Sequence, residues 1–400
     1  MSLPRPWRPK QAAEETRGGA LHTGGIELGR IAVPCAAVTI VGIAGLVAFV
    51  GADARWLAAL GNVIVSHRTV PTGVPFAAAP TAHWAKPSVL AEVVFHGLES
   101  LFGDRGLMIA QLLAAAIATA MLARDALAGG ASAQGTAAAL LLAGLGALPG
   151  LSVARAQLFS VAMFPALVAL LRSEGRHPTR RIWAVVPLIA VWSNLHGAVL
   201  VGFGVTLIYL VMVRSRCDPR AAVAIAVASL VGLCLTPAGV RTIDYYHGVI
   251  TNQAAARGQG LWAPLSLSAP FDIMLIAVAA ALAVQFLRSK PPLWEIVVSI
   301  GLAAMTAETS RSGIWLLFFL VPPAARAFEQ RRVWDRVLPA LGTAGVVLLL
   351  LAIIRGPLPI GGSHAIIARA IALAHGTPVL AEDVEAEQVA LAGGRIWIGN

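Results

Sequence analysis

The chain has 400 residues, of which 58% are hydrophobic and 12% are charged, with a mean hydropathy of +0.77 and a net charge of +10. A soluble globule of this length needs more polar side chains to cover its surface, and repeated apolar runs of nearly twenty residues are typical of helices that cross a bilayer. The composition therefore excludes an ordinary soluble protein and predicts an all-α polytopic membrane protein.

The predicted spans begin after a polar arm over residues 1–30, which we expect to be cytoplasmic. The first apolar run is long enough to cross a bilayer, so we expect a retained signal anchor and not a cleaved signal peptide. About eleven transmembrane helices are expected in a membrane domain over residues 31–355. The runs cover residues 31–50, 106–123, 134–151, 156–171, 182–195, 197–213, 221–236, 271–287, 292–307, 313–327 and 337–354.

Lysine and arginine are divided unequally between the loops on the two sides of these spans. The side that holds the amino terminus has 19 of them, and the other side has 11, mostly in long loops where charge has least influence on orientation. This bias predicts a multi-pass protein of the cell membrane with a cytoplasmic amino terminus and an extracytoplasmic carboxyl terminus. The same basic loops account for the net charge, so we expect no nucleic-acid partner.

Residues 51–105 form the first extracytoplasmic loop of this topology, and Asp53 lies where the first span emerges into water. Apolar side chains at helical spacing predict two interfacial helices in the loop, the second from about Ser88. Arg55 is expected on the polar face of the first helix. The apolar faces would comprise Trp56, Leu57, Leu60, Val63 and Ile64 in the first helix, and Leu90, Val94, Leu98 and Leu101 in the second.

Glu92, His96 and Glu99 are spaced four and three residues apart, so a helix places them on one face. Together with Asp53, such a face is suited to bind a phosphate-linked substrate or a divalent cation. A solvated face of an interfacial helix is the alternative explanation of the same pattern.

Tight outer turns carry further candidates for substrate binding. Arg155 lies between two apolar runs that almost no loop separates, and a guanidinium there can hold a phosphate or simply extend to the membrane surface. Asn194 and His196 occupy a similar turn, where a histidine is more often a packing residue than a catalyst. Arg311 lies three residues after Glu308, and an ion pair between them is expected.

The loop over residues 237–270 mixes aromatic and hydrogen-bonding side chains, among them Arg241, Tyr245 and Arg257. This mixture suits stacking on a sugar ring, and it equally suits an aromatic belt at the membrane surface. Residues 356–400 are then expected to form a small extracytoplasmic α/β tail, either minimal or truncated. Its predicted elements are a helix over 365–375, a strand over 378–381, a helix over 382–391 and a strand over 395–398.

Several of these features occur together in one family. The arrangement resembles the bacterial GT-C integral-membrane glycosyltransferases over about residues 25–360, with an Asp after the first span and an outer loop with two interfacial helices. The motifs are Arg-x-Gln-x-Phe (Arg155, Gln157, Phe159), Trp-x-Asn-x-His-Gly (Trp192, Asn194, His196, Gly197) and Pro-x-Gly (Pro237, Gly239). The resemblance implies inverting transfer of a sugar from a polyprenyl-phosphate donor to a cell-envelope glycan or lipid, with Asp53 as general base. It leaves open whether a divalent cation takes part.

The chemistry of glycosyl transfer is compatible with these residues. An ionised carboxylate can accept the proton of an acceptor hydroxyl as the bond to an oxocarbenium-like carbon forms. The departing phosphate needs cations, which Arg155, Arg241, Arg257 or Arg311 would supply.

Two other classes of function remain open. A membrane scaffold without catalytic activity would present the tail and place no demand on Asp53. A lipid or solute transporter would need charged positions near the membrane midplane and an internal repeat, and the sequence has few of the former and no visible repeat.

Overall fold

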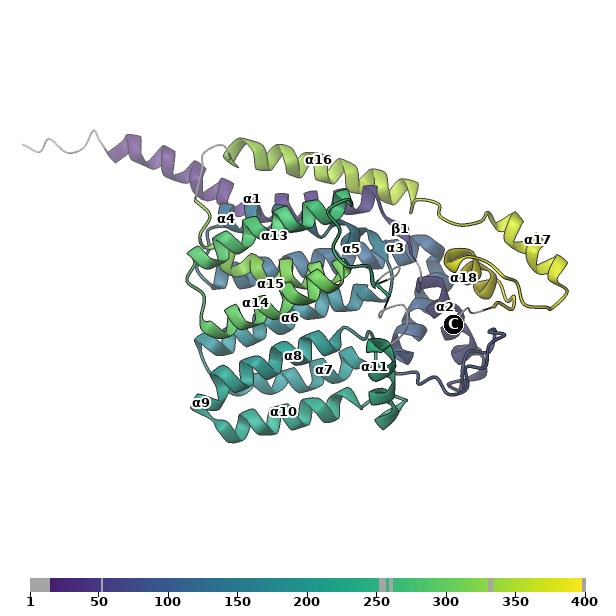
Figure 1. The fold of residues 1–400 in the computed structure, drawn as a ribbon. Helices are drawn as coiled ribbons and strands as arrows, with labels where there is room; N and C mark the ends of the chain where they lie inside the picture. Colours follow the sequence, from purple (N-terminus) through teal and green to yellow (C-terminus); the bar gives the residue numbers. More distant parts are fainter. Residues whose placement is uncertain (1–14, 52, 252–256, 259–261, 330–333, 398–400) are drawn as a thin grey trace, which may run out of the picture.

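The computed structural model describes residues 15–51, 53–251, 257–258, 262–329 and 334–397, and most of them are helical (Figure 1). Helices lie side by side in a main body, and a smaller lobe with α2 (Ala54–His67), α17 (His364–Ala374) and α18 (Asp383–Leu391) lies at one end. The other elements are α1 (Glu15–Leu46), β1 (Phe49–Val50), α3 (Val89–Ala128), α4 (Ala133–Gly146), α5 (Leu148–Ser152), β2 (Val153–Ala154), α6 (Gln157–Arg176), η1 (Arg180–Ala184), α7 (Val185–Ser193), α8 (Val199–Tyr209), η2 (Leu210–Arg214), α9 (Ser215–Cys217), α10 (Pro219–Leu233), η3 (Gly239–Arg241), α11 (Thr242–Ile250), α13 (Pro270–Arg288), α14 (Leu293–Glu308), η5 (Ser310–Ser312), α15 (Gly313–Ala325) and α16 (Trp334–Arg355).

Every apolar run of the sequence lies mainly on helices, as predicted, although some boundaries differ. The first helix ends at Leu46, so the expected run over 31–50 finishes as the strand β1, and a break at Ala147 divides the run over 134–151. Within the described residues, five helices are long and apolar enough to cross a membrane, and several other apolar helices are shorter. The five are Val89–Ala128, Gln157–Arg176, Val199–Cys217, Pro270–Arg288 and Arg336–Arg355.

The helices α1 and α16 lie against each other along their lengths although they are far apart in the sequence (Figure 1). Glycines permit this contact: a Cβ atom on Gly42 would lie 2.3 Å from the carbonyl oxygen of Gly345. Backbones can approach this closely only where both helices carry small side chains, which is a common packing mode of helices in lipid.

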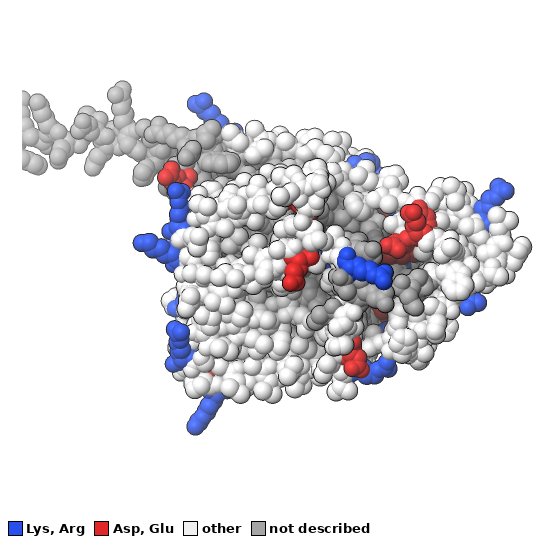
Figure 2. Space-filling view, viewed as in Figure 1, with Lys and Arg blue, Asp and Glu red and all other residues white. Residues whose placement is uncertain are grey.

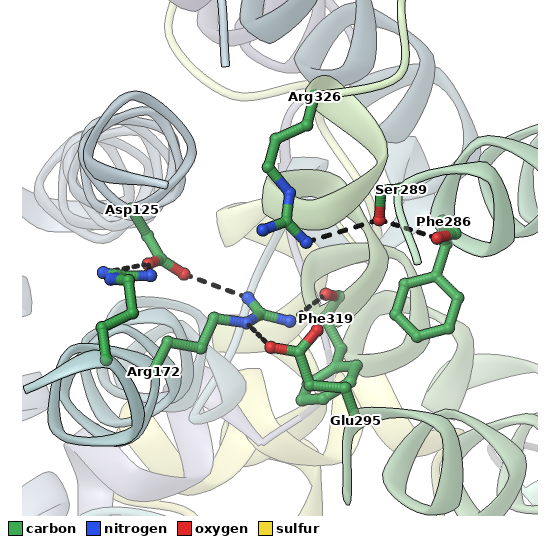
Figure 3. A network of polar contacts seen from close by, with 8 residues as sticks. Asp125, Arg172, Phe286, Ser289, Glu295, Phe319 and Arg326 are labelled. Atoms are coloured by element: carbon green, nitrogen blue, oxygen red, sulfur yellow. Dashed lines mark hydrogen bonds and ion pairs between the residues drawn. The ribbon is translucent and has the colours of Figure 1, made fainter. Parts of the chain in front are cut away.

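A buried group of charges joins four helices at the end of the body opposite the lobe (Figure 3). Arg172 on α6 contacts Asp125 on α3 and Glu295 on α14, each at 3.0 Å, and donates to the carbonyl oxygen of Phe319 on α15 at 2.7 Å. The guanidinium also lies 4.6 Å from the centre of the Phe319 ring. The Arg172 side chain is buried, and it neutralises two buried carboxylates.

The first loop contains the two expected helices, but a charged side chain in each of them is buried. Arg55 is only 5% exposed, because Asp104 binds its guanidinium through both carboxylate oxygens at 2.8 and 3.2 Å. In the amino-terminal part of α3, before a kink at Gly103, Glu92 is buried, whereas Leu101 is 73% exposed. Of the predicted apolar face of this helix, Leu90 is also exposed and Leu98 packs partly against the core, whereas Glu92 lies in the interior.

The carboxyl-terminal tail contains both predicted helices, as α17 and α18. The two predicted strands are reduced to isolated bridges, in which Ile396 pairs with Val379 and also with Ala77 of the first loop, and residue 398 lies outside the described residues. The tail packs its apolar side chains on α2 and not on a sheet of its own. The buried members of this cluster are Ala59, Ile367, Ala386, Val389, Ala390 and Ile396.

Candidate functional site

The short strands β1 and β2 bring together the chain segments that carry Asp53 and Arg155. Strand β1 pairs in parallel with β2, so Val50 lies opposite Ala154, and the N–H of Gly51 donates to the carbonyl oxygen of Ala154 at 3.1 Å. A Cβ atom on Gly51 would lie 2.3 Å from Cγ1 of Val153, so only glycine allows this approach. Because Arg155 follows β2 directly and Asp53 lies three residues after the end of β1, the pairing brings both residues to one place.

The carboxylate of Asp53 and the guanidinium of Arg155 form an ion pair, with Oδ2 and Nη2 2.8 Å apart. The Asp53 side chain is 48% exposed and that of Arg155 is 13% exposed, so the carboxylate remains accessible while the cation is held in the wall. Asp53 has a left-handed backbone conformation with φ 81°, which aspartate tolerates better than most residues. Its side chain consequently turns toward Arg155 and does not cap α2, the helix that begins at the next residue.

A cavity of about 810 Å³ adjoins this ion pair, and most of the predicted site residues line it. Its walls come from the first loop, from the turn after β2 and the turn after α7, from helix α11, and from the turn between α14 and α15. The predicted residues that the fold brings together here are Asp53, Glu92, Arg155, His196, Tyr245 and Arg311.

Four predicted residues do not line the cavity. Asn194 donates to the carbonyl oxygens of Ala190 and Leu235 at 2.8 and 2.7 Å, so it ties two chain segments together. Arg241 donates to the carbonyl oxygen of His83 at 2.6 Å. The other two are His96, on the part of α3 that packs against α2, and the exposed Arg257.

Three Lys and Arg side chains line the cavity, together with the acidic side chains of Asp53, Glu92 and Glu308. Burial lowers the pKa of Arg311, and the nearby charge of Arg155 lowers it further, although a guanidinium remains charged at neutral pH. Arg311 was expected to pair with Glu308, but in the described part of the chain it forms no ion pair, and its guanidinium lies 3.9 Å from the centre of the Trp262 ring. Two cations that repel each other in one wall are favourably placed for a ligand with two or more anionic oxygens.

Lys86 is the third cation, and it is not among the residues that the sequence patterns predict for the site. Its Nζ is buried and has no hydrogen-bond partner among the described residues. Burial lowers the pKa of the ammonium, and the charge of Glu92 opposes that shift. The sequence did contain a signal, since Lys86 is the single basic residue between Arg68 and Arg105.

His196 is held as a neutral hydrogen-bond donor. The indole N–H of Trp192 donates to Oγ of Ser160 at 2.6 Å, so the hydroxyl hydrogen of Ser160 is directed to Nδ1 of His196 at 2.7 Å. The N–H of Ala198 lies 3.3 Å from the same nitrogen. Because Nδ1 accepts from two donors, the ring hydrogen is on Nε2. Burial, together with the charges of Arg155 and Arg311, lowers the pKa of His196 to about 3.

Tyr245 and several tryptophans complete the wall. Burial raises the pKa of the Tyr245 hydroxyl, and the charge of Asp53 raises it further, so this phenol stays protonated and can donate. The aromatic side chains provide flat surfaces on which a sugar ring can stack. They are Trp56, Trp84, Trp262 and Trp315.

A divalent cation at this site stays a prediction. Among the residues that the structure describes, no three His, Cys, Asp or Glu side chains converge as a metal-binding group.

In comparisons with known proteins, no family model, no curated protein and no solved structure matches this chain.

Proposed function

We propose that this chain is a membrane glycosyltransferase of the GT-C type, which moves a sugar from a polyprenyl-phosphate donor to an extracytoplasmic acceptor with inversion. The observation that carries the proposal is the half-exposed Asp53 carboxylate, paired with Arg155 at the wall of a cavity that also holds Arg311. A base, two cations and stacking surfaces in one cavity match what transfer from a sugar phosphate requires.

In the proposed reaction, Asp53 accepts the hydroxyl proton of the acceptor while the acceptor oxygen attacks the anomeric carbon. The bond from that carbon to the phosphate oxygen breaks, and the lipid phosphate leaves with the bonding electrons. An oxocarbenium-like transition state carries positive charge on the sugar, which a nearby carboxylate stabilises. Asp53 is bound to Arg155, so an arriving phosphate competes for the guanidinium and frees the carboxylate.

The phosphate would lie among the cations of the cavity. Arg155 and Arg311 offer guanidinium donors, and the unpartnered Nζ of Lys86 offers an ammonium. His196 adds a neutral N–H through Nε2, which has no hydrogen-bond partner in the described part of the chain. Donors that are fixed before the substrate binds stabilise a leaving anion without reorganising during the reaction.

An apolar pocket beside the cavity is suited to the lipid part of the donor. It has a volume of about 250 Å³, and Leu200 lines both the pocket and the cavity. Its walls are aliphatic and aromatic side chains of α8, α10 and α11, so a hydrocarbon chain can lie there while its phosphate reaches the cations. The lining residues are Leu200, Phe203, Leu230, Leu233, Cys234, Thr242, Ile243 and Tyr246.

We further propose that the eleven apolar runs are the membrane spans, with the amino terminus in the cytoplasm and the tail outside. Lysine and arginine side chains gather along the end of the body that carries α9, whereas acidic and basic side chains are mixed at the opposite end (Figure 2). This distribution supports a cytoplasmic position for the α9 end. The cavity then opens on the extracytoplasmic side, where the lobe lies.

The proposal is tested by sugar transfer in membranes that contain equal amounts of wild-type protein, Asp53→Asn or the control Asp244→Asn. Asp244 is an exposed carboxylate on α11 that does not line the cavity. With radiolabelled polyprenyl-phosphate sugars, we expect transfer by the wild type and the control, and loss of at least 10²-fold in Asp53→Asn, the range of a lost general base.

Equal transfer by all three proteins would show that Asp53 is not the base. Silence of all three over a panel of donors would favour the non-catalytic scaffold, and movement of a lipid without transfer would favour the transporter.

A further inference from the structure

We propose that Glu387 in the carboxyl-terminal tail is a positioning residue for Asp53, so that the docked tail completes the candidate site. This inference rests on the proposed function for its catalytic consequence, but its structural part stands without it. The contact joins residues 334 positions apart: the backbone N–H of Asp53 donates to Oε1 of Glu387.

The contact answers a specific need of α2. The first N–H groups of a helix lack partners inside the helix, and a side chain at the residue before the helix usually accepts from one of them. Asp53 holds that position but forms no such bond, since its carboxylate is turned to Arg155. Glu387 places a carboxyl oxygen at this end of the helix from outside, and this oxygen accepts from the N–H of Asp53.

The tail is fixed at this place by packing as well as by the carboxylate. Val389 and Ala390 on α18 pack in one buried cluster with Ala59 of α2. On the other side of the lobe, the N–H of Ala78 donates to the carbonyl oxygen of Ile396 and the N–H of Ile396 donates to that of Phe76, both at 2.9 Å. Glu387 is therefore only 7% exposed, and it binds the Asp53 backbone from a helix that packs against α2.

The charges around Glu387 make this contact dependent on pH. Burial raises the pKa of Glu387 to about 8. Hydrogen bonds from the Asp53 and Trp56 amides and the charge of Arg55 oppose this increase, whereas the Asp53 carboxylate adds to it. A carboxyl whose pKa is higher in the docked state than its ordinary value of 4.5 takes up a proton on docking. Docking is therefore favoured most at low pH, and it weakens as the pH rises from about 4.5 through about 8.

Hydrogen exchange on the full chain in detergent micelles tests the structural part. We would compare wild type, Glu387→Ala, Glu387→Gln and the control Glu382→Gln, which changes an exposed carboxylate at the start of α18. In Glu387→Ala, amides in the peptide that contains Asp53 and Trp56 should exchange about tenfold faster, as expected for the loss of one hydrogen bond. Glu387→Gln keeps a carbonyl acceptor and should restore slow exchange, with a weaker dependence on pH.

Sugar-transfer kinetics of the same proteins test the effect of Glu387 on catalysis. Glu387→Ala should lower kcat about tenfold and leave KM for the donor unchanged, because it disturbs the base and not the cations. Glu387→Gln should recover kcat and flatten its pH profile between 5 and 8.

Exchange near Asp53 that does not respond to Glu387→Ala would overturn the positioning role. Exchange that responds, in a protein whose wild type transfers no sugar, would overturn the proposed function and leave the positioning role standing. If Glu387→Ala fails to fold, Glu387→Asp, which shortens the side chain by one methylene, replaces it in both measurements.

Discussion

Oδ2 of Asp53 and Nη2 of Arg155 lie 2.8 Å apart, although 102 residues separate them in the sequence. The cause is the parallel pairing of β1 with β2, which ends at Ala154, immediately before Arg155, and at Val50, three residues before Asp53. A parallel pair fixes the register of the two chains, so each residue emerges at a defined position relative to the other. The ion pair at the mouth of the cavity is thus a product of backbone pairing.

Gly51→Ala should separate this ion pair. The new Cβ would meet Cγ1 of Val153 at 2.3 Å, so the strands must move apart, and overpacking of this kind typically costs about 1–3 kcal/mol. We expect a lower thermal midpoint and at least a tenfold loss of sugar transfer. The second substitution Val153→Ala removes Cγ1 and should restore most of both.

The matched control for this experiment is Gly97→Ala. A Cβ atom on Gly97 meets nothing within 4 Å, and its helical position should make alanine stabilising by up to about 1 kcal/mol. Equal losses in Gly51→Ala and Gly97→Ala would contradict the role of the strand pair.

Arg155→Lys should weaken binding of the donor phosphate. Lysine retains the charge but cannot bridge Asp53 and a phosphate with a planar set of donors. We expect KM for the donor to rise by about tenfold or more, in line with the loss of one charge-assisted hydrogen bond. Arg257 is exposed and lies outside the cavity, so the control Arg257→Lys should behave as the wild type. An unchanged KM in Arg155→Lys would indicate that this arginine does not bind the donor.

His196→Gln should alter the stability of the protein in acid. The folded protein holds His196 neutral down to a pKa of about 3, whereas an unfolded chain protonates a histidine near its ordinary value of 6.5. The unfolded state therefore binds more protons in this window, and the stability contributed by the neutral ring is lost as the pH falls from about 6.5 toward 3.

Thermal unfolding in detergent between pH 4 and 8 checks this expectation. The wild type should lose more stability in acid than His196→Gln, while the exposed His364→Gln should follow the wild type. Parallel curves for wild type and His196→Gln would mean that the ring is not held neutral.

Arg172→Met should destabilise the body strongly. Removing the guanidinium leaves the buried carboxylate of Glu295 without its cation and leaves Asp125 with only the longer contact to Arg176 at 3.4 Å. Loss of one partner of a buried ion pair typically costs about 3–5 kcal/mol. The triple variant Arg172→Met, Asp125→Asn, Glu295→Gln removes all three charges and should recover part of the loss. Arg220 is exposed, so Arg220→Met is the control for the loss of a basic side chain. Equal thermal midpoints of Arg220→Met and Arg172→Met would contradict the prediction.

The sequence by itself determined that the chain is helical and where its apolar helices lie. A run of nearly twenty apolar residues can satisfy its backbone hydrogen bonds in a bilayer only as a helix, so composition and run length suffice for that prediction. The sequence also identified Asp53 and Arg155 as candidates, because charged residues beside apolar runs are conspicuous in a chain with so few of them.

Only the tertiary structure decided which candidates meet. It brought Asp53, Arg155 and Arg311 to one cavity and left Arg241 and Arg257 outside. Helical periodicity assigns faces to a helix but does not say which face meets a neighbour. For this reason, the inward position of Glu92 and the burial of Arg172 could not be predicted.

The contact of Glu387 with Asp53 could not be predicted from the sequence either. A hydrogen bond between residues at opposite ends of the chain depends on how the tail docks on α2, and no local pattern encodes that docking. Local sequence thus set the elements, and the packing of side chains between distant elements set the site.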